Sequence, residues 1–580
     1  MRKFGLIFIV LVINISLLFS SADRLDTLLD NFEKEYLKLH PEKATDLELS
    51  RDLEYVDYGS YYTYSKKELE KEYKIYNKYY KELIEIDSNT LSAKEKKEYK
   101  LLKTMLELKI EGEKFKEHEY LLHYMLGFQS SIPTMLINKH RISNQEDVQN
   151  FIKRINLLPV VIANIREQID YRKKNKLLAP RYSIERLISS MERFIEYEPK
   201  NHPLILSYKR KIKKGNLKKK KIKELEEKII ETLKNNVYPE YGKFINELKK
   251  LKREATDISG VWRLPEGDNY YKYCLKVNTT TDLTPEEIHE IGLNQIERIQ
   301  NEIMKLTKEL GIKGDNFSER INNYFKEIYG KNTDKIIKSN KKAVIRYKKI
   351  VRRMERKLSK YFKRTPASKA TVKEIPEYAK GTLGTHYEYS KSVGTFYVSI
   401  WEGGMFEEGM KPLTYHETVP GHHLQISLFR ESEYYRPYRS FFFYPGYVEG
   451  WAMYAEQLCK EIGRYRNNYQ LISYYRSELL RAVRIVLDTG IHYKKWSREE
   501  AYNYMEKNLG WASFGSIDRY SVWPGQACGY EIGKLKILKI RDKYKEIKGE
   551  TYNLKDFHEF VLEDGTIPLL ILEDKLNNLQ

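Results

Sequence analysis

The chain has 580 residues, and its 103 Lys and Arg residues outnumber its 82 Asp and Glu residues, so the formal net charge is +21. Hydrophobic residues make up 41% of the sequence, which is enough for a large core and excludes an intrinsically disordered protein. Because the lysines are spread along the chain and mixed with glutamates, the positive charge alone does not indicate a nucleic-acid partner, and we expect none.

The N-terminus predicts export. Arg2 and Lys3 precede an apolar run from Phe4 to Phe19, which is followed by Ser20-Ser21-Ala22. A charged segment, an apolar segment and small residues at a cleavage site are the three parts of a signal peptide. We therefore expect residues 1–22 to be a signal peptide, and the mature protein to be periplasmic or extracellular without stable membrane insertion. A retained membrane anchor is the alternative, although the apolar run is short for a span.

Most of the chain shows helical periodicity. Between residues 23 and 255, apolar residues recur at helical spacing among charged ones. After a stretch punctuated by Gly and Pro, Thr284-Pro285-Glu286-Glu287 predicts a helix start, with Thr284 as the cap and Glu287 completing a capping box. We expect helix to continue from there to about Ala379.

One segment reads as a strand. Residues Gly394–Trp401 are β-branched and aromatic and are bounded by glycines, whereas the pattern from Leu413 onward is again mostly helical. The predicted fold class is therefore mostly α, a large multi-helix fold with one small β-sheet. We expect an N-terminal helical part, 23–255, and a catalytic part that contains the metal site, 256–580, within one integrated domain.

The stretch HETVPGHH, residues 416–423, resembles the zinc motif H-E-x-x-H with the wrong spacing. Pro420 occupies the position of the second histidine and cannot bind metal. Its ring clashes with the carbonyl group of His416, and it lacks the N–H group that would continue the helix. A bulge that loops out two or three residues near Pro420 would return either His422 or His423 to a metal bound by His416.

Three glutamates are candidates for the remaining roles at such a site. Glu417 lies beside the first histidine and could reach a metal-bound water as general base. Glu449 begins the apolar and aromatic segment EGWAMYAE, where a buried carboxylate needs a partner, and is the candidate third ligand. Glu456 lies two helical turns further along and is the candidate to hold a ligating imidazole.

Hydrolysis of a peptide bond also develops an oxyanion, which a His or Tyr side chain usually helps to stabilise. His492, which follows Asp488 and Gly490 in a helical region, and Tyr520, in the aromatic segment 519–526, are the two candidates for this role.

Seven blocks of sequence occur in an order that is familiar. They are GVWRLPEGDNYY, NTTTDLTPEEIHEIG, HETVPGHHLQ, YVEGWAMYAEQL, VLDTGIHYKKW, DRYSVWPGQACGYEIGKLKIL and FHEFVLEDGTIPLLILE. Together, from about residue 260 to 572, they resemble the bacterial "domain of unknown function 885" family, zinc metallopeptidases of the gluzincin type. The resemblance implies a mostly helical zinc-peptidase fold with a deep cleft, as in the angiotensin-converting enzyme and thimet-oligopeptidase groups. It also implies one Zn²⁺ per chain, held by His416, by His422 or His423, and by Glu449, with Glu417 as base.

The expected function is therefore that of an exported zinc-dependent metallopeptidase that hydrolyses peptides. The strand at Gly394–Trp401 is expected to align the peptide substrate by main-chain pairing. The alternative is a catalytically inactive periplasmic peptide- or metal-binding protein on the same fold. The presence of Glu417 argues against that alternative, because a site that only binds metal needs no base beside its first histidine.

Overall fold

The computed structural model describes residues 20–50, 52–213, 215–331, 333–375, 384–390, 392–400, 403–432 and 435–579. Residues 1–19 of the predicted signal peptide, 1–22, lie outside the described residues. The expected cleavage site after Ala22 falls in the first turn of helix α2, which begins at Ser21. Within the described part of the chain, no helix combines the length and the apolar character that crossing a membrane requires.

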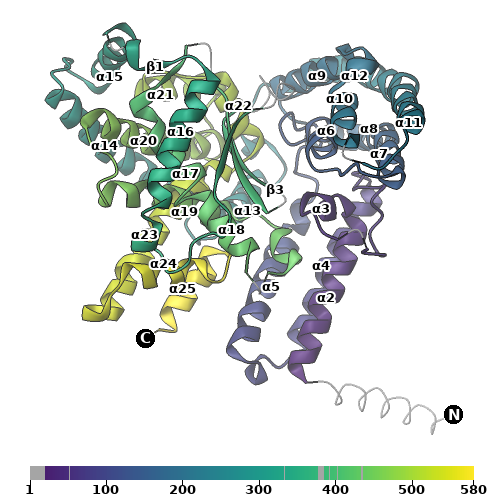
Figure 1. Ribbon diagram of the computed structural model, residues 1–580, viewed down its shortest axis with the longest axis horizontal. Helices are drawn as coiled ribbons and strands as arrows, with labels where there is room; N and C mark the ends of the chain where they lie inside the picture. The colour runs from purple at the N-terminus through teal and green to yellow at the C-terminus, as the bar shows by residue number, and fades with distance from the viewer. Residues whose placement is uncertain are drawn as a thin grey trace. The chain divides into compact units, whose positions relative to one another are not determined.

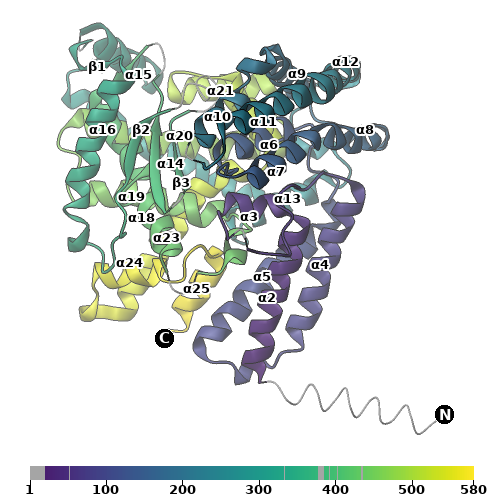
Figure 2. The same ribbon diagram turned by 45° about the vertical axis from the view of Figure 1, so that its right-hand side comes forward.

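The chain packs into two compact units. The first contains residues up to 119 together with 128–173 and 190–247. Both Figure 1 and Figure 2 show α2, α4 and α5 of this unit lying side by side. Its helices are α2 (Ser21–Leu39), α3 (Pro41–Asp46), α4 (Lys66–Ile84), α5 (Ala93–Glu111), α6 (Phe128–Asn138), α7 (Gln145–Asn156), α8 (Leu158–Lys174), α10 (Pro203–Ile212) and α11 (Lys219–Thr232), with the C-terminal part of α9 (Arg181–Glu196) and most of α12 (Tyr238–Glu254).

The second unit contains residues 120–127, 174–189 and 248–580. Its centre is formed by two long helix pairs, in which α14 packs along α20 and α19 packs along α23. Its helices are α13 (Gly267–Thr279), α14 (Pro285–Glu309), α15 (Phe317–Lys326), α16 (Asn340–Glu355), α17 (Met410–Glu417), α18 (His422–Arg430), α19 (Pro445–Glu461), α20 (Asn468–His492), α21 (Arg498–Leu509), α22 (Phe514–Val522), α23 (Gly529–Lys548), α24 (Leu554–Leu562) and α25 (Leu569–Asn577).

These helices confirm the mostly α class, and the start of α14 confirms the predicted capping box. The Thr284 hydroxyl accepts from the Glu287 N–H at 3.2 Å, and the Glu287 carboxylate accepts from the Thr284 N–H at 2.8 Å. Two of the backbone donors at this helix end are thereby satisfied, as the sequence pattern requires.

Close approach and buried charge together hold α19, α20 and α23. A Cβ atom on Gly450 of α19 would lie 2.6 Å from the backbone of Gly533 on α23, so only glycine permits this crossing. Nearby is an ion network that we name the α20–α23 ion network. It consists of the buried residues Glu478, Glu531 and Lys534 and of Arg298 from α14, with Lys534 Nζ 2.5 Å from an oxygen of each glutamate.

The described strands form two small sheets. One pairs β1 (Ile336–Ile337) with β5 (Met405–Phe406), and the other has the order β2-β4-β3, with β2 (Thr371–Glu374), β3 (His386–Ser390) and β4 (Val393–Val398). Helix α16 packs against β2 and β4, and α18 packs against β3.

Two expectations for this region are wrong. Helix does not continue to Ala379, because α16 ends at Glu355 and the β-branched pair Thr371-Val372 begins β2 instead. The strand predicted at Gly394–Trp401 corresponds to β4, which ends at Val398, and Trp401 lies outside the described residues. This strand is central and pairs with β2 on one side and β3 on the other, so its main chain cannot also pair with a substrate.

Candidate metal centre

The motif at residues 416–423 folds as two helices joined by a tight link. Helix α17 ends at Glu417, the backbone leaves helical geometry at Thr418 (φ −115°, ψ −116°), and α18 begins at His422. A Cβ atom on Gly421 would lie 2.0 Å from the carbonyl oxygen of His416, so only glycine allows the chain to pass this close. The link therefore returns the chain beside its own preceding turn, and the rings of His416 and His422 lie 4.8 Å apart.

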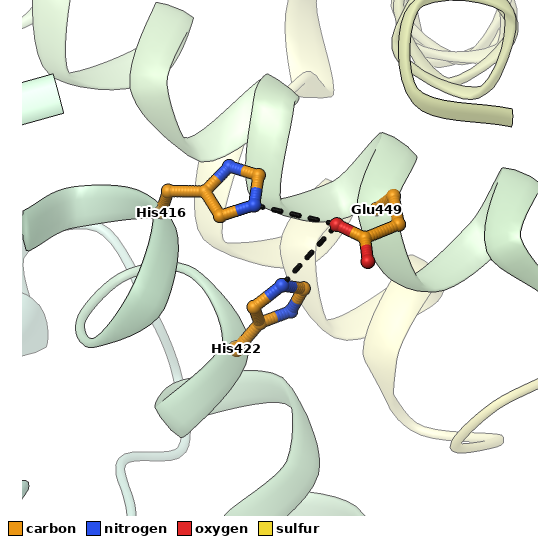
Figure 3. Close-up of side chains that lie close together, drawn as sticks. All are labelled: His416, His422 and Glu449. Atoms are coloured by element: carbon orange, nitrogen blue, oxygen red, sulfur yellow. Dashed lines mark ion pairs between the residues drawn. The ribbon is translucent and has the colours of Figure 1, made fainter. Parts of the chain in front are cut away.

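Glu449 of α19 meets both of these histidines (Figure 3). Its Oε2 atom lies 3.3 Å from His416 Nε2 and 3.4 Å from His422 Nε2, and the three donor atoms lie within 4.8 Å of one another. Two ligand bonds of about 2.05 Å at a tetrahedral angle separate their donor atoms by about 3.3 Å. The donor chemistry therefore fits a tetrahedral zinc ion, and the two separations from Glu449 match those of neighbouring zinc ligands.

The electrostatics of the cluster agree with a cation site. Burial alone would raise the pKa of Glu449, but His422 and His416 beside it hold that pKa well below its usual value. Burial alone would lower the pKa of His416, but the carboxylates of Glu449 and Glu456 raise it to about 9. The carboxylates thus favour a positive charge at this point, which a proton or a metal ion can supply.

Glu456 lies where the sequence suggests a supporting role. Its Oε1 atom accepts a hydrogen bond from His416 Nδ1 at 2.9 Å, and the Tyr465 hydroxyl donates to its backbone carbonyl at 3.3 Å. With Nδ1 as donor, the lone pair of His416 is on Nε2, the atom that faces Glu449. Both side chains are buried, at 4% and 0% exposure, so water does not compete for this contact.

Glu417 is half-buried at the last position of α17. Burial, and to a smaller extent the charge of Glu417, raises the pKa of Tyr347 and of Tyr387, so the carboxylate lies near both of these tyrosines. Glu417 makes no hydrogen bond and no ion pair with any residue that the structure describes. Its carboxylate is therefore available to a substrate or a water.

His423, the second candidate for the ligand after Pro420, points elsewhere. Its Nε2 atom lies 2.9 Å from the carbonyl oxygen of Ser368, and its Nδ1 atom lies 3.0 Å from the hydroxyl of Tyr387. Both ring nitrogens are thus used by neighbouring elements, and the structure brings His422 rather than His423 to Glu449.

His492 and Tyr520 do not occupy the positions expected of oxyanion donors. His492 Nδ1 accepts from the Val261 N–H at 3.1 Å and its Nε2 lies 3.0 Å from the carbonyl oxygen of Tyr520, so the backbone occupies both ring nitrogens. Burial also lowers the pKa of His492 to about 4. This geometry therefore does not favour His492 as an oxyanion donor. The Tyr520 hydroxyl accepts from Arg484 Nε at 3.0 Å and so acts on the site only through that arginine.

Sequence reasoning missed two residues that the structure places near the cluster. Tyr530 of α23 stacks on His416 with ring centroids 6.4 Å apart, and the guanidinium of Arg484 lies 5.4 Å from the centre of the Tyr530 ring. Burial alone would lower the pKa of Arg484, but Tyr520, Tyr530 and the Glu449 carboxylate raise it. A signal for Arg484 was present, because a charged residue in the apolar run around 483–487 needs a partner just as Glu449 does.

Fold and site together define a class: a mostly helical protein in which two histidines and a glutamate converge on one point. A family model described as "Bacterial protein of unknown function (DUF885)" matches residues 41–576, which is most of the chain. The chain therefore belongs to this family. No match was found among curated proteins.

Two solved structures are similar to this chain. One is that of a "putative lipoprotein" from Colwellia psychrerythraea, with 26% identity and a TM-score of 0.86 over 96% of this chain and 99% of that one. The other is that of a "putative lipoprotein of unknown function" from Shewanella oneidensis, with 18% identity and a TM-score of 0.73 over 97% of this chain and 100% of that one. The second likeness concerns the fold alone.

Proposed function

We propose that this protein is a zinc-dependent metallopeptidase of the gluzincin type. The observation that carries the proposal is the spacing of Glu449 Oε2 from His416 Nε2 and His422 Nε2, 3.3 and 3.4 Å. Next to the first ligand is the Glu417 carboxylate, which has no hydrogen-bond partner among the described residues. Three protein ligands leave one tetrahedral position open, which distinguishes a catalytic zinc site from a structural one.

The chain's own residues supply the rest of the chemistry. A bound zinc ion supplies a Lewis acid and lowers the pKa of a coordinated water to roughly 7. Glu417 accepts the proton of the attacking water and returns it to the leaving amine. Glu456 keeps His416 in the tautomer and orientation that a ligand needs. Tyr530 and Arg484 replace His492 and Tyr520 as the proposed donors to the oxyanion.

We also propose that the protein is exported, so that its peptide substrates are met in a periplasm or outside the cell. The support is the charged start and apolar run of residues 2–19, together with the similarity to a structure described as a "putative lipoprotein". Secretion of a fusion to residues 1–22, and its loss when the apolar run carries two added lysines, would test this part of the proposal.

Metal content and peptide cleavage, measured on the same preparations, test the proposed activity. The wild type, Glu417→Gln and the control Glu290→Gln, an exposed glutamate of α14, are each incubated with a peptide library that is read by mass spectrometry. We expect about one zinc per chain in all three. We expect cleavage by the wild type and the control, and a loss of at least about 100-fold in Glu417→Gln.

The other outcomes separate the alternatives. Zinc in all three proteins without cleavage in any of them would contradict the peptidase proposal and favour a metal- or peptide-binding protein. Absence of zinc from all three would show that His416, His422 and Glu449 do not form a zinc site.

A further inference from the structure

A cavity of about 270 Å³ lies within the second unit, beside the helix that carries the first metal-ligand candidate. Part of its wall is formed by Gly409, just before the start of α17, and by Pro412 and Leu413 in the first turn of that helix. Residues three and four apart share one face of a helix, and His416 and Glu417 are the next positions on this face. The α17 residues that line the cavity and the proposed site residues therefore lie on the same face of this helix, one turn apart.

A second wall leads to the same place along α20. Ser473, Arg476, Ser477 and Arg481 line the cavity at helical spacing, and Arg484 follows Arg481 on the same face. Arg484 is the residue that faces Glu449 and the ring of Tyr530. Because α17 and α20 pack against each other, the cavity and the candidate metal centre are neighbours along both helices. Leu479 and Leu480 of α20, together with apolar side chains of α15 and of the segment 509–511, complete the lining.

The two arginines of this cavity lack acidic partners in the described part of the chain. Burial lowers the pKa of Arg476, and the titratable groups that oppose this shift are the hydroxyls of Tyr324 and Tyr329. The Arg476 guanidinium lies 4.3 Å from the centre of the Phe325 ring. Arg481 Nη1 donates to the hydroxyl and carbonyl oxygens of Ser477, at 2.7 and 3.1 Å. Its Nε atom is buried and has no hydrogen-bond partner among the described residues.

Such an arrangement is costly without a ligand. Removing a guanidinium from water is unfavourable unless an anion or several acceptors replace the lost hydration. A carboxylate is the anion that a guanidinium binds best, because two of its N–H groups can donate to the two oxygens in parallel. The cavity joins this charge to an apolar lining, as a site for the end or the side chain of a peptide requires.

We propose that this cavity binds a carboxylate of the peptide substrate through Arg476 and Arg481. This inference rests on the proposed peptidase function and specifies its substrate as a peptide that presents a carboxylate close to the cleaved bond. At 1.5 Å per residue, Arg481 and Arg476 lie about 4.5 and 12 Å from Arg484 along α20. One to four residues of extended peptide, at roughly 3.3 Å each, cover that span. The carboxylate is either the free C-terminus or an acidic side chain.

Equilibrium binding tests the proposal without requiring turnover. The protein is the full chain with Glu417→Gln, loaded with zinc, and the probe is N-dansyl-(Ala-Gly)₃ in three forms, followed by fluorescence anisotropy. The forms are the free C-terminal acid, the C-terminal amide, and an amide whose last residue is Glu. Arg476→Gln and Arg481→Gln are then compared with Arg352→Gln, a control that removes an exposed arginine from α16. Circular dichroism melting confirms that each variant is folded.

We expect the free acid to bind roughly 10- to 100-fold more tightly than the amide. Each cavity variant should lose most of this preference, whereas Arg352→Gln should retain it. Tight binding of the Glu-ended amide would identify an acidic side chain as the source of the carboxylate, and weak binding would identify the free C-terminus.

Equal binding of all three peptides, no binding of any, or a preference that survives both cavity variants would overturn the proposal. These measurements are repeated without zinc, so a failure of the metallopeptidase proposal remains distinguishable. If only the metallopeptidase proposal fails, cleavage or bound zinc will be absent but the preference for the carboxylate will persist.

Discussion

Replacing Glu456 isolates the contribution of a residue that touches neither the proposed metal nor a substrate. Glu456 Oε1 lies 2.9 Å from His416 Nδ1, and both side chains are buried. Glu456→Gln keeps an oxygen that can accept this hydrogen bond but removes its charge. Glu456→Leu removes the acceptor as well and leaves the N–H group of His416 buried without a partner.

The expected magnitude follows from this geometry. Loss of a residue that orients a metal-ligating histidine costs about 10- to 100-fold in metal affinity, or roughly 1.4 to 2.7 kcal/mol. Because the contact is short and excludes water, Glu456→Gln should weaken zinc binding about tenfold. Glu456→Leu should approach 100-fold, since an unsatisfied buried donor adds its own cost.

Competition with a chromogenic chelator at pH 7.5 measures these affinities. The control is Glu461→Gln, on the same helix α19, where the carboxylate pairs with Arg541 rather than with a histidine. The control should bind zinc like the wild type. If both Glu456 variants stay folded and bind zinc within twofold of the wild type, the proposed role of Glu456 in orienting His416 as a ligand is refuted.

Three further predictions concern the supporting structure. Gly421→Ala places a Cβ atom 2.0 Å from the His416 carbonyl oxygen, so zinc affinity should fall at least about tenfold in the same competition assay. Burial raises the pKa of Asp488 from 3.8 to about 7, so the folded state holds this proton more tightly than the unfolded state. The protonated carboxyl therefore contributes fully to stability below about pH 4, and this contribution is lost as the pH rises to 7. In urea unfolding between pH 4 and pH 7, the free energy of unfolding of Asp488→Asn should fall by up to about 4 kcal/mol less than that of the wild type. Lys534→Met leaves Glu531 without its cation and Glu478 with Arg298 alone, and should reduce the free energy of unfolding by about 3–5 kcal/mol. Lys536→Met, on the same helix but partly exposed, should have a much smaller effect, and equal effects of the two would contradict the buried role.

Local features of this fold could be predicted because they depend on neighbouring residues. The capping box at Thr284 and Glu287 satisfies backbone groups within one turn. The break after Glu417 follows from the missing N–H group and the ring of Pro420, whatever the rest of the chain does. The central position of β4 could not be predicted, since its partners β2 and β3 are chosen by packing against α16 and α18.

The candidate site divides in the same way. The sequence by itself determined the types of side chain present, the interruption between the two histidine positions, and the need of Glu449 for a partner in an apolar segment. Only the tertiary structure decided between His422 and His423, and only it replaced His492 with Tyr530 and Arg484 near the cluster. The physical reason is that the direction of a side chain at a helix end depends on the link before it and on the helix packed against it. For His422 these are the tight passage at Gly421 and helix α19.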